Sequence, residues 1–179
     1  MIRTGIGYDI HKLKEGLPLF IGGINVKSLL GSVGHSDGDA LIHAIADSLL
    51  GASGLGDIGK FFPSDDEKWR DAQSNIFLSE VKRMILQKVY QISNIDCTII
   101  IQKPKLQKFV PDIRKNIAKI LNISEELLSI KATTTDHLGV IGESKGWSVI
   151  AIATIYKNDE QSNNKFESKS KYWTKNFKG

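Results

Sequence analysis

Histidines and aspartates gather in two short segments of the chain. Residues 7–11 read Gly-Tyr-Asp-Ile-His and residues 35–43 read His-Ser-Asp-Gly-Asp-Ala-Leu-Ile-His, so these segments hold three of the four histidines. A spacing of two on a strand puts Asp9 and His11 on the same face, which suits two ligands of one metal ion. Carboxylate and imidazole together are good zinc ligands.

His43 is the third candidate ligand. Asp39 precedes it by four residues, so a helix would display both side chains on one side. Three protein ligands leave a tetrahedral zinc ion one open position, which is the pattern of a catalytic site. Asp39 is expected either to orient a ligand histidine or to cap the helix. An isolated Asp-x-His is more often structural, but two such segments favour a metal site, whose ion the spacing does not identify.

Three further segments are candidates for binding phosphate. Ser36 and the N–H groups beside it are expected at the start of a helix, where orphan donors favour anions, although Ser36 could also be only an N-cap. Residues 54–63 form a glycine-bearing loop that offers Asp57 as a hydroxyl acceptor. Residues 131–139 carry three threonines and Asp136, which suit phosphate oxygens and a harder second cation, or simply a strand end and a turn.

The elements that must position these residues alternate between strand and helix. Apolar spacing predicts strands over 2–11, 17–26, 94–102, 128–133 and 147–156. It predicts helices over 37–50, with Gly51 as terminator, around 77–85, and over 110–121, with Pro111 in the first turn. Ser124 is a candidate cap for one more helical turn, and residues 51–66 are expected to be a loop. This order is typical of an α/β fold, here an α+β sandwich with a mixed β-sheet and helices packed on one face.

The last predicted strand is apolar on both faces. Val149, Ala151 and Ala153 alternate with Ile150 and Ile152. Helices can cover only one side of the sheet, so the other side needs a cover of its own. In a chain of 179 residues, a partner subunit is the natural cover.

Bulk composition narrows the class of protein. The formal net charge is +4, and residues 158–179 carry five lysines against three acids, so about half of the excess lies in this polar tail, which we expect to be flexible. We expect one domain over 1–157, no nucleic-acid partner and no membrane span. Cys97 is the single cysteine and is expected in the core, which indicates a reducing compartment. Chemistry-bearing residues begin near Tyr8, so we expect no leader peptide and a cytoplasmic location.

Five motifs together resemble the cyclodiphosphate synthase family. They are GYDIH, GHSDGDALIH, LGDIGKFFP, IIIQKPKL and IKATTTDHLG, in that order over residues 2 to about 156. The resemblance implies a lyase of non-mevalonate isoprenoid biosynthesis that turns 4-diphosphocytidyl-2-C-methyl-D-erythritol 2-phosphate into 2-C-methyl-D-erythritol 2,4-cyclodiphosphate and CMP. It also implies a homotrimer with its sheets facing the threefold axis and active sites between subunits.

The resemblance assigns roles to individual residues. One zinc ion per subunit would be held by Asp9, His11 and His43, while His35 and Thr134 would stabilise the transition state. Mg²⁺ or Mn²⁺ would accompany the substrate diphosphate, with Asp136 as its candidate ligand. The implied substrate contacts are Asp9, His11, His35, Ser36, Asp57, Ile58, Gly59, Phe62, Pro63, Ser64, Asp65, Asp66, Ile101, Pro104, Lys105, Leu106, Ala132, Thr133, Thr134, Thr135, Asp136, Val140 and Glu143.

Three positions depart from the family pattern. Asp136 stands where glutamate is usual and is expected to reach its cation through water. Glu143 and Lys145 exchange the charges of a Gly-Arg-x-Glu-Gly pattern, which bears on isoprenoid diphosphate binding in the trimer cavity. Ser64 stands where aspartate is common. A zinc phosphohydrolase and a non-catalytic isoprenoid-diphosphate-binding protein are the alternative functions.

Overall fold

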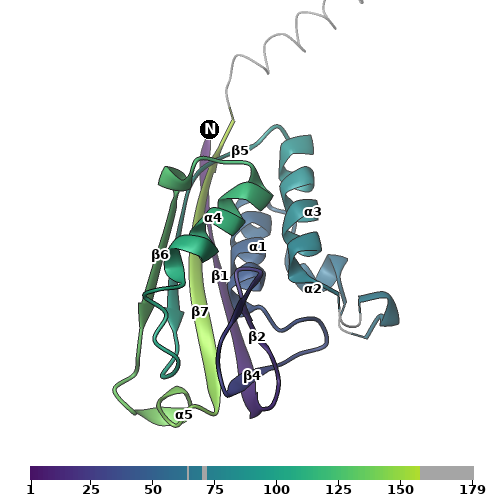
Figure 1. Ribbon diagram of the computed structural model, residues 1–179. Helices are drawn as coiled ribbons and strands as arrows, with labels where there is room; N and C mark the ends of the chain where they lie inside the picture. The colour runs from purple at the N-terminus through teal and green to yellow at the C-terminus, as the bar shows by residue number, and fades with distance from the viewer. Residues whose placement is uncertain (64, 70–71, 158–179) are drawn as a thin grey trace, which may run out of the picture.

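A five-stranded mixed sheet forms the centre of the fold. The computed structural model describes residues 1–63, 65–69 and 72–157. In these residues the strand order is β4, β1, β7, β5, β6 (Figure 1). The strands are β1 Ile2–Glu15, β4 Leu30–Val33, β5 Gln91–Ile100, β6 Leu128–Thr133 and β7 Gly146–Tyr156. β5 and β6 are parallel and the other pairs are antiparallel. The predicted mixed sheet is therefore confirmed.

β1 and β7 pair along almost their whole length. Their register runs from Ile2 opposite Tyr156 to Lys12 opposite Gly146. Asp9 lies opposite Val149, so the segment that carries the Asp-x-His motif is held on one side by a long antiparallel neighbour. Such pairing fixes which face each side chain occupies, because side chains alternate along a strand.

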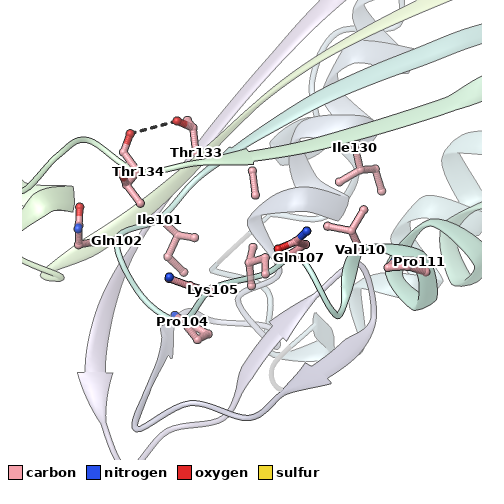
Figure 2. A pocket seen from close by; sticks show the side chains of 12 residues that line it. Ile101, Gln102, Pro104, Lys105, Gln107, Val110, Pro111, Ile130, Thr133 and Thr134 are labelled. Carbon is pink, nitrogen blue, oxygen red and sulfur yellow. Dashed lines mark hydrogen bonds between the residues drawn. The ribbon is translucent and has the colours of Figure 1, made fainter.

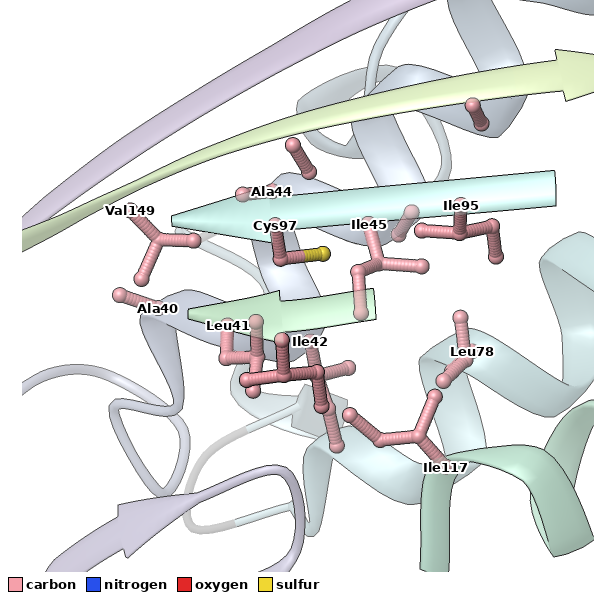
Figure 3. Close-up of a cluster of buried hydrophobic side chains, with 14 of the residues drawn as sticks. Ala40, Leu41, Ile42, Ala44, Ile45, Leu78, Ile95, Cys97, Ile117 and Val149 are labelled. Carbon is pink, nitrogen blue, oxygen red and sulfur yellow. The ribbon is translucent and has the colours of Figure 1, made fainter. Parts of the chain in front are cut away.

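Three helices cover one face of this sheet (Figure 1). They are α1 Ala40–Ser53, α3 Ser74–Gln87 and α4 Val110–Leu121. Side chains of α1, α3, α4, β5 and β7 meet in one apolar core, part of which Figure 3 shows. α1 lies very close to β1, since a Cβ atom added to Gly7 would stand 1.9 Å from the carbonyl oxygen of Ala44. The glycines of β1 thus allow this strand, which carries Asp9 and His11, to lie against the helix that carries His43.

The opposite face of the sheet is apolar and open to solvent in the single chain. On β1, Ile6 is 69% exposed and Tyr8 is 55% exposed. On β7, Ile150 and Ile152 are also exposed, whereas Val149 and Ala151 on the other face are fully buried. The two apolar faces predicted for the last strand are therefore confirmed, and the outer one has no cover within the described part of the chain.

The segment predicted as one strand over 17–26 is a hairpin instead. It forms β2 Leu19–Ile21 and β3 Ile24–Val26, which make a separate two-stranded sheet. Gly22 and Gly23 lie between them with φ of 60° and 75°, and this left-handed geometry turns the chain back on itself. β4 was not predicted, and β1 continues past His11 to Glu15 in order to pair with it.

The first predicted helix is displaced towards the C-terminus. The Asp39 carboxylate caps α1 by accepting from Ile42 N, so the helix begins at Ala40 rather than at residue 37. Gly51 lies inside α1, and the left-handed Gly54, with φ of 68°, ends it. The start of α4 with Pro111 in its first turn, the Ser124 cap of the short 3₁₀ turn η2 Glu125–Leu127, and β6 over 128–133 are confirmed.

Short helical elements occupy regions expected to be irregular. α2 Ile58–Phe61 and the 3₁₀ turn η1 Glu67–Trp69 lie in or beside the predicted loop, and α5 Gly139–Gly142 follows the threonine segment. None of the described helices combines the length and apolar character that crossing a membrane requires. The tail predicted over 158–179 lies outside the described residues.

Candidate active site

The side chains of Asp9, His11 and His43 meet where α1 lies against β1. The Asp9 Oδ2 atom is 2.9 Å from His11 Nε2 and 2.9 Å from His43 Nδ1. The two ring nitrogens are 3.3 Å apart. The three side chains are between 15% and 25% exposed, so a bound ion would be reachable from one side.

These distances fit a tetrahedral metal ion. Zinc lies about 2.0–2.2 Å from nitrogen and oxygen ligands, which puts two ligand atoms of a tetrahedron roughly 3.3 Å apart. The three observed separations lie near that value, and only a small outward movement would be needed to admit an ion. Within the described residues, this is the one group of three or more His, Cys, Asp or Glu side chains with such geometry.

The surroundings of Asp9 favour the ionised form of its carboxylate, which is the form that binds metal ions. Burial would raise the pKa of Asp9, but hydrogen bonds and charge from His11 and His43 outweigh it and hold the pKa well below its ordinary value. Burial would lower the pKa of His11, but the hydrogen bond and charge of Asp9 raise it instead. Asp9 is therefore an anion at neutral pH, which suits a cation at this place.

Two further contacts orient the histidine rings. His11 Nδ1 donates to the carbonyl oxygen of Val33 on β4, at 3.0 Å, which leaves Nε2 on the metal side. His43 Nε2 lies 3.0 Å from the hydroxyl of Ser74, at the start of α3. Asp39 plays the capping role that was one of its two expected roles, and it also accepts from Gly23 N at 2.6 Å.

Ser36 lies four residues before the first residue of α1, so its expected position at a helix start is wrong. Asp39 takes the cap, and Gly38, with φ of 68°, separates the Ser36 loop from the helix. The Ser36 hydroxyl is nevertheless near the triad, 3.4 Å from His43 Nε2. Any anion binding at Ser36 therefore comes from a loop beside the metal site and not from the end of α1.

The triad opens into a cavity of about 280 Å³. Its lining consists of Asp9, His11, His35, Ser36, His43, Ile58, Gly59, Phe62, Trp69 and Phe77. Sequence reasoning missed Trp69 and the placement of Phe77 here. Phe77 lies in the helix predicted around 77–85, and its ring centroid lies 6.2 Å from that of His43 and 5.5 Å from that of Trp69. These aromatic rings make one side of the cavity apolar.

A second cavity, of about 570 Å³, lies between the end of β5, the end of β6 and the start of α4 (Figure 2). Its lining consists of Ile101, Gln102, Pro104, Lys105, Leu106, Gln107, Val110, Pro111, Ile130, Ala132, Thr133 and Thr134. All seven residues expected from 101–106 and 132–134 are among them. Figure 2 shows the Thr133 hydroxyl directed to the carbonyl oxygen of Thr134, at 3.3 Å. Gln102 and Gln107 add polar groups that the sequence reasoning had not selected.

The remaining expected residues lie outside the linings of these two cavities. Asp57 caps α2 by accepting from Lys60 N, and the Asp66 carbonyl oxygen accepts from His35 Nε2 at 3.2 Å. Asp57 thus lies at the start of the helix that contributes Ile58 and Gly59 to the triad cavity, and Asp66 is bonded to His35, another lining residue. The other described residues of this group are Pro63, Asp65, Thr135, Asp136, Val140 and Glu143. Ser64 is not among the described residues.

The two cavities are separated within the chain. The triad cavity is built on β1, whereas the second cavity is built on β5 and β6, with β7 between β1 and β5. Neighbouring strands lie about 4.8 Å apart, so β1 and β6 are roughly 14 Å apart across the sheet. His35 and Thr134, which the family resemblance gives one shared role, consequently lie in different cavities of the same chain.

Comparison with known proteins gives a consistent result. The YgbB family model matches residues 2–156. The chain is 47% identical over 161 residues to the 2-C-methyl-D-erythritol 2,4-cyclodiphosphate synthase of Clostridium kluyveri, covering 90% of this chain and 98% of the relative. It is 48% identical over 155 residues to the same enzyme of Treponema denticola, covering 87% of this chain and 96% of the relative.

Solved structures share the fold. The CDP complex of IspF from Plasmodium falciparum has a TM-score of 0.78 at 42% identity, and the match covers 88% of this chain and 97% of that one. The bifunctional IspDF of Campylobacter jejuni has a TM-score of 0.85 at 37% identity. That match covers 88% of this chain but 43% of the bifunctional chain, so only one part of that protein corresponds to the chain described here.

Proposed function

The chain belongs to the YgbB family, and we propose that its two cavities together form the site of the family reaction. It has 2-C-methyl-D-erythritol 2,4-cyclodiphosphate synthase activity in non-mevalonate isoprenoid biosynthesis. Its substrate is 4-diphosphocytidyl-2-C-methyl-D-erythritol 2-phosphate, and its products are the cyclic diphosphate and CMP. The observation that carries the proposal is the triad of Asp9, His11 and His43, whose ligand atoms are 2.9–3.3 Å apart. We assign the catalytic domain to 1–157.

Zinc is the ion that best suits the triad. Two imidazoles and one carboxylate in near-tetrahedral spacing leave one position for a substrate oxygen. When bound there, zinc would polarise a phosphate oxygen and neutralise negative charge that develops in the transition state. The half-buried, aromatic-lined cavity strengthens that effect, because charges interact more strongly where water is excluded.

The reaction places few chemical demands on the side chains. An oxygen of the 2-phosphate attacks the β-phosphorus, the bond between that phosphorus and the bridging oxygen breaks, and CMP leaves with the electron pair. The nucleophile is already an anion, so no strong base is required, and no water is consumed. The protein must fold the substrate on itself and hold it, which is catalysis by proximity and electrostatics.

Individual residues supply these functions. We assign the methylerythritol phosphate to the triad cavity, where His35, Ser36 and the backbone of Ile58 and Gly59 would hold it. The CDP portion fits the second cavity, whose backbone and Lys105 are suited to a nucleotide. The Thr134 hydroxyl would support the phosphate that receives the attack.

A homotrimer would bring the two cavities together. One substrate must reach both, yet within a chain they are separated by the width of several strands. The uncovered apolar face over Ile6, Tyr8, Ile150 and Ile152 is suited to burial against neighbouring subunits around a threefold axis. Each active site would then take its triad from one subunit and its nucleotide cavity from the next.

Asp136 is proposed as the residue that would hold a second cation, Mg²⁺ or Mn²⁺, which would neutralise charge on the substrate diphosphate. It lies in the turn after β6 with φ of 49° and accepts from the Thr134 hydroxyl at 3.4 Å. Its short side chain favours contact through water. Direct coordination by Asp136 in a metal-bound structure would refute that detail.

Product analysis tests the proposed function. The purified protein is incubated with the CDP-linked substrate in ¹⁸O-water, with zinc and after zinc chelation, and the products are followed by ³¹P NMR and mass spectrometry. We expect CMP and the cyclic diphosphate without ¹⁸O, and loss of both on chelation. Open-chain phosphates carrying ¹⁸O would instead identify a zinc phosphohydrolase. Nucleotide binding without turnover would identify a non-catalytic binding protein.

The trimer has its own test. Ile6→Glu places a charge on the open face, whereas Ile76→Glu places one on α3, where Ile76 is also exposed. Light scattering coupled to gel filtration should give a trimer for the unmodified protein and for Ile76→Glu, and smaller species with low activity for Ile6→Glu. A fully active monomer of the unmodified protein would exclude sites between subunits.

A further inference from the structure

The His43 imidazole has a polar neighbour at each of its two nitrogens. Nδ1 faces Asp9 Oδ2 at 2.9 Å, on the side of the metal triad. Nε2 faces away from the triad, towards the hydroxyl of Ser74 at 3.0 Å. A neutral imidazole carries its proton on one nitrogen and a lone pair on the other, and a metal ion can bind only the lone pair. The partner at Nε2 therefore decides whether Nδ1 is available.

Ser74 has its single proton committed elsewhere. Its hydroxyl donates to Asp37 Oδ1, and its backbone N–H donates to Asp37 Oδ2 at 2.9 Å. The Ser74 oxygen can then only accept from His43, which puts a proton on Nε2. The Ser36 hydroxyl is the more distant neighbour of this nitrogen, at 3.4 Å against 3.0 Å for Ser74. Ser74 is fully buried, so water does not compete for these bonds.

We propose that Asp37 and Ser74 are positioning residues that hold His43 as the Nδ1 ligand of the metal ion. The Asp37 carboxylate orients the Ser74 hydroxyl, and that hydroxyl fixes both the tautomer and the ring orientation of His43. This inference rests on the proposed zinc site. Removing a residue that hydrogen-bonds a metal ligand commonly weakens metal affinity by about 10–100-fold.

The same two residues join the parts of the chain that make the site. Asp37 belongs to the loop before α1, and Ser74 is the first residue of α3. Gln73, the residue preceding α3, makes no capping hydrogen bond with its side chain, and Asp37 instead accepts from a free N–H of the first turn. Asp37 N also donates to the carbonyl oxygen of Ala72, at 3.3 Å. The start of α3 and the orientation of His43 are thus set by one carboxylate.

The first measurement uses the unmodified protein. In zinc-loaded protein with ¹⁵N-labelled histidine, long-range ¹H–¹⁵N spectra distinguish a metal-bound nitrogen from a protonated one. We expect His43 to show a metal-bound Nδ1 and a protonated Nε2 whose proton exchanges slowly with water. Zinc bound through Nε2, or a His43 ring without a protonated Nε2, would overturn the proposal without any substitution.

The second measurement compares matched variants. Ser74→Ala removes the hydroxyl, while Ser79→Ala removes one from an exposed site on the same helix, where it contacts only the carbonyl oxygen of Asn75 among the hydrogen bonds of the described residues. Competition with a chelator should give zinc binding about 10–100-fold weaker for Ser74→Ala and unchanged for Ser79→Ala. The visible spectrum of the Co²⁺-loaded Ser74→Ala protein should also shift, because the ring is less firmly oriented.

The outcomes distinguish the positioning role of Asp37 and Ser74 from the proposed zinc site. If the unmodified protein binds no zinc at the triad, the zinc assignment itself fails. If it binds zinc and Ser74→Ala binds zinc equally well, the positioning role of Asp37 and Ser74 is overturned while the zinc assignment stands. Should Ser74→Ala fail to fold, Asp37→Ala replaces it, because alanine removes both acceptors of Ser74 and leaves its hydroxyl free to donate to His43 Nε2. Zinc affinity of folded Asp37→Ala equal to that of the unmodified protein would then overturn the proposal.

Discussion

Replacing Gly7 by alanine should disturb the proposed metal site by forcing α1 away from β1. An added Cβ atom would lie 1.9 Å from the carbonyl oxygen of Ala44 and 2.9 Å from the backbone nitrogen of Ser48. Real Cβ atoms keep at least 3.0 Å from such atoms. α1 and β1 would therefore have to separate by about 1.1 Å, the difference between 3.0 Å and 1.9 Å. Gly7 has no positive φ, so the alanine backbone itself is unstrained.

The displacement acts directly on the ligands. Asp9 follows Gly7 by two residues, and His43 immediately precedes Ala44, so the movement pulls one ligand away from the other. Metal–ligand distances tolerate changes of only about 0.2 Å. We expect zinc affinity to fall by more than about 100-fold, beyond the usual effect of losing an outer partner. Overpacking should also lower the free energy of unfolding by about 1–3 kcal/mol.

Chelator competition measures zinc affinity, and urea unfolding of the metal-free protein measures stability. Gly51→Ala is the matched control, since Gly51 is an exposed residue of α1 whose added Cβ would have its nearest neighbour, the Ile6 carbonyl oxygen, at 4.0 Å. The free energy of unfolding of Gly51→Ala should rise by about 0.5–1 kcal/mol, because alanine suits a helix interior better than glycine. Wild-type zinc affinity and stability in Gly7→Ala would refute the idea that this contact sets the site geometry.

Three shorter predictions follow from the core and the triad. His43→Ala should lose zinc and nearly all turnover while its circular dichroism stays unchanged; full activity after metal depletion would contradict the zinc assignment. Burial raises the pKa of the Cys97 thiol to about 12, so iodoacetamide near pH 8 should leave it unmodified in folded protein and alkylate it in denaturant, and rapid alkylation of the folded protein would be the contrary result. Trp147→Phe removes a buried 2.9 Å hydrogen bond to Ser32 and leaves a void. The free energy of unfolding, measured with urea, should therefore fall by about 2–3 kcal/mol. A fall of less than roughly 0.5 kcal/mol would argue against that packing.

Sequence patterns predicted the long elements because burial imposes a period on them. Alternation over 147–156 and helical spacing over 110–121 each extend for ten residues or more, and both elements formed within a residue of the expected limits. Short elements lack such a signal. The β2–β3 hairpin depends on the positive φ of Gly22 and Gly23, and α2 depends on one cap from Asp57, neither of which apolar spacing records.

The grouping of Asp9, His11 and His43 was predictable because two of them are two residues apart on a strand. Ser74 was not predictable, because its hydroxyl reaches His43 across 31 residues of sequence and only the packing of α3 beside α1 brings them together. Nor did spacing indicate that His35 and Thr134 belong to different cavities. That separation follows from the strand order, which places β7 and β5 between β1 and β6.

The pairing of β1 with β7 also determines when the metal site can form during synthesis. Asp9 and His11 leave the ribosome long before the strand opposite them, which spans residues 146–156. Until that strand has emerged, β1 has no partner on that side and Asp9 is not held in register with His43. The three side chains can therefore come together only after nearly the whole described chain has been made, so the triad is not a nucleus around which the nascent chain folds.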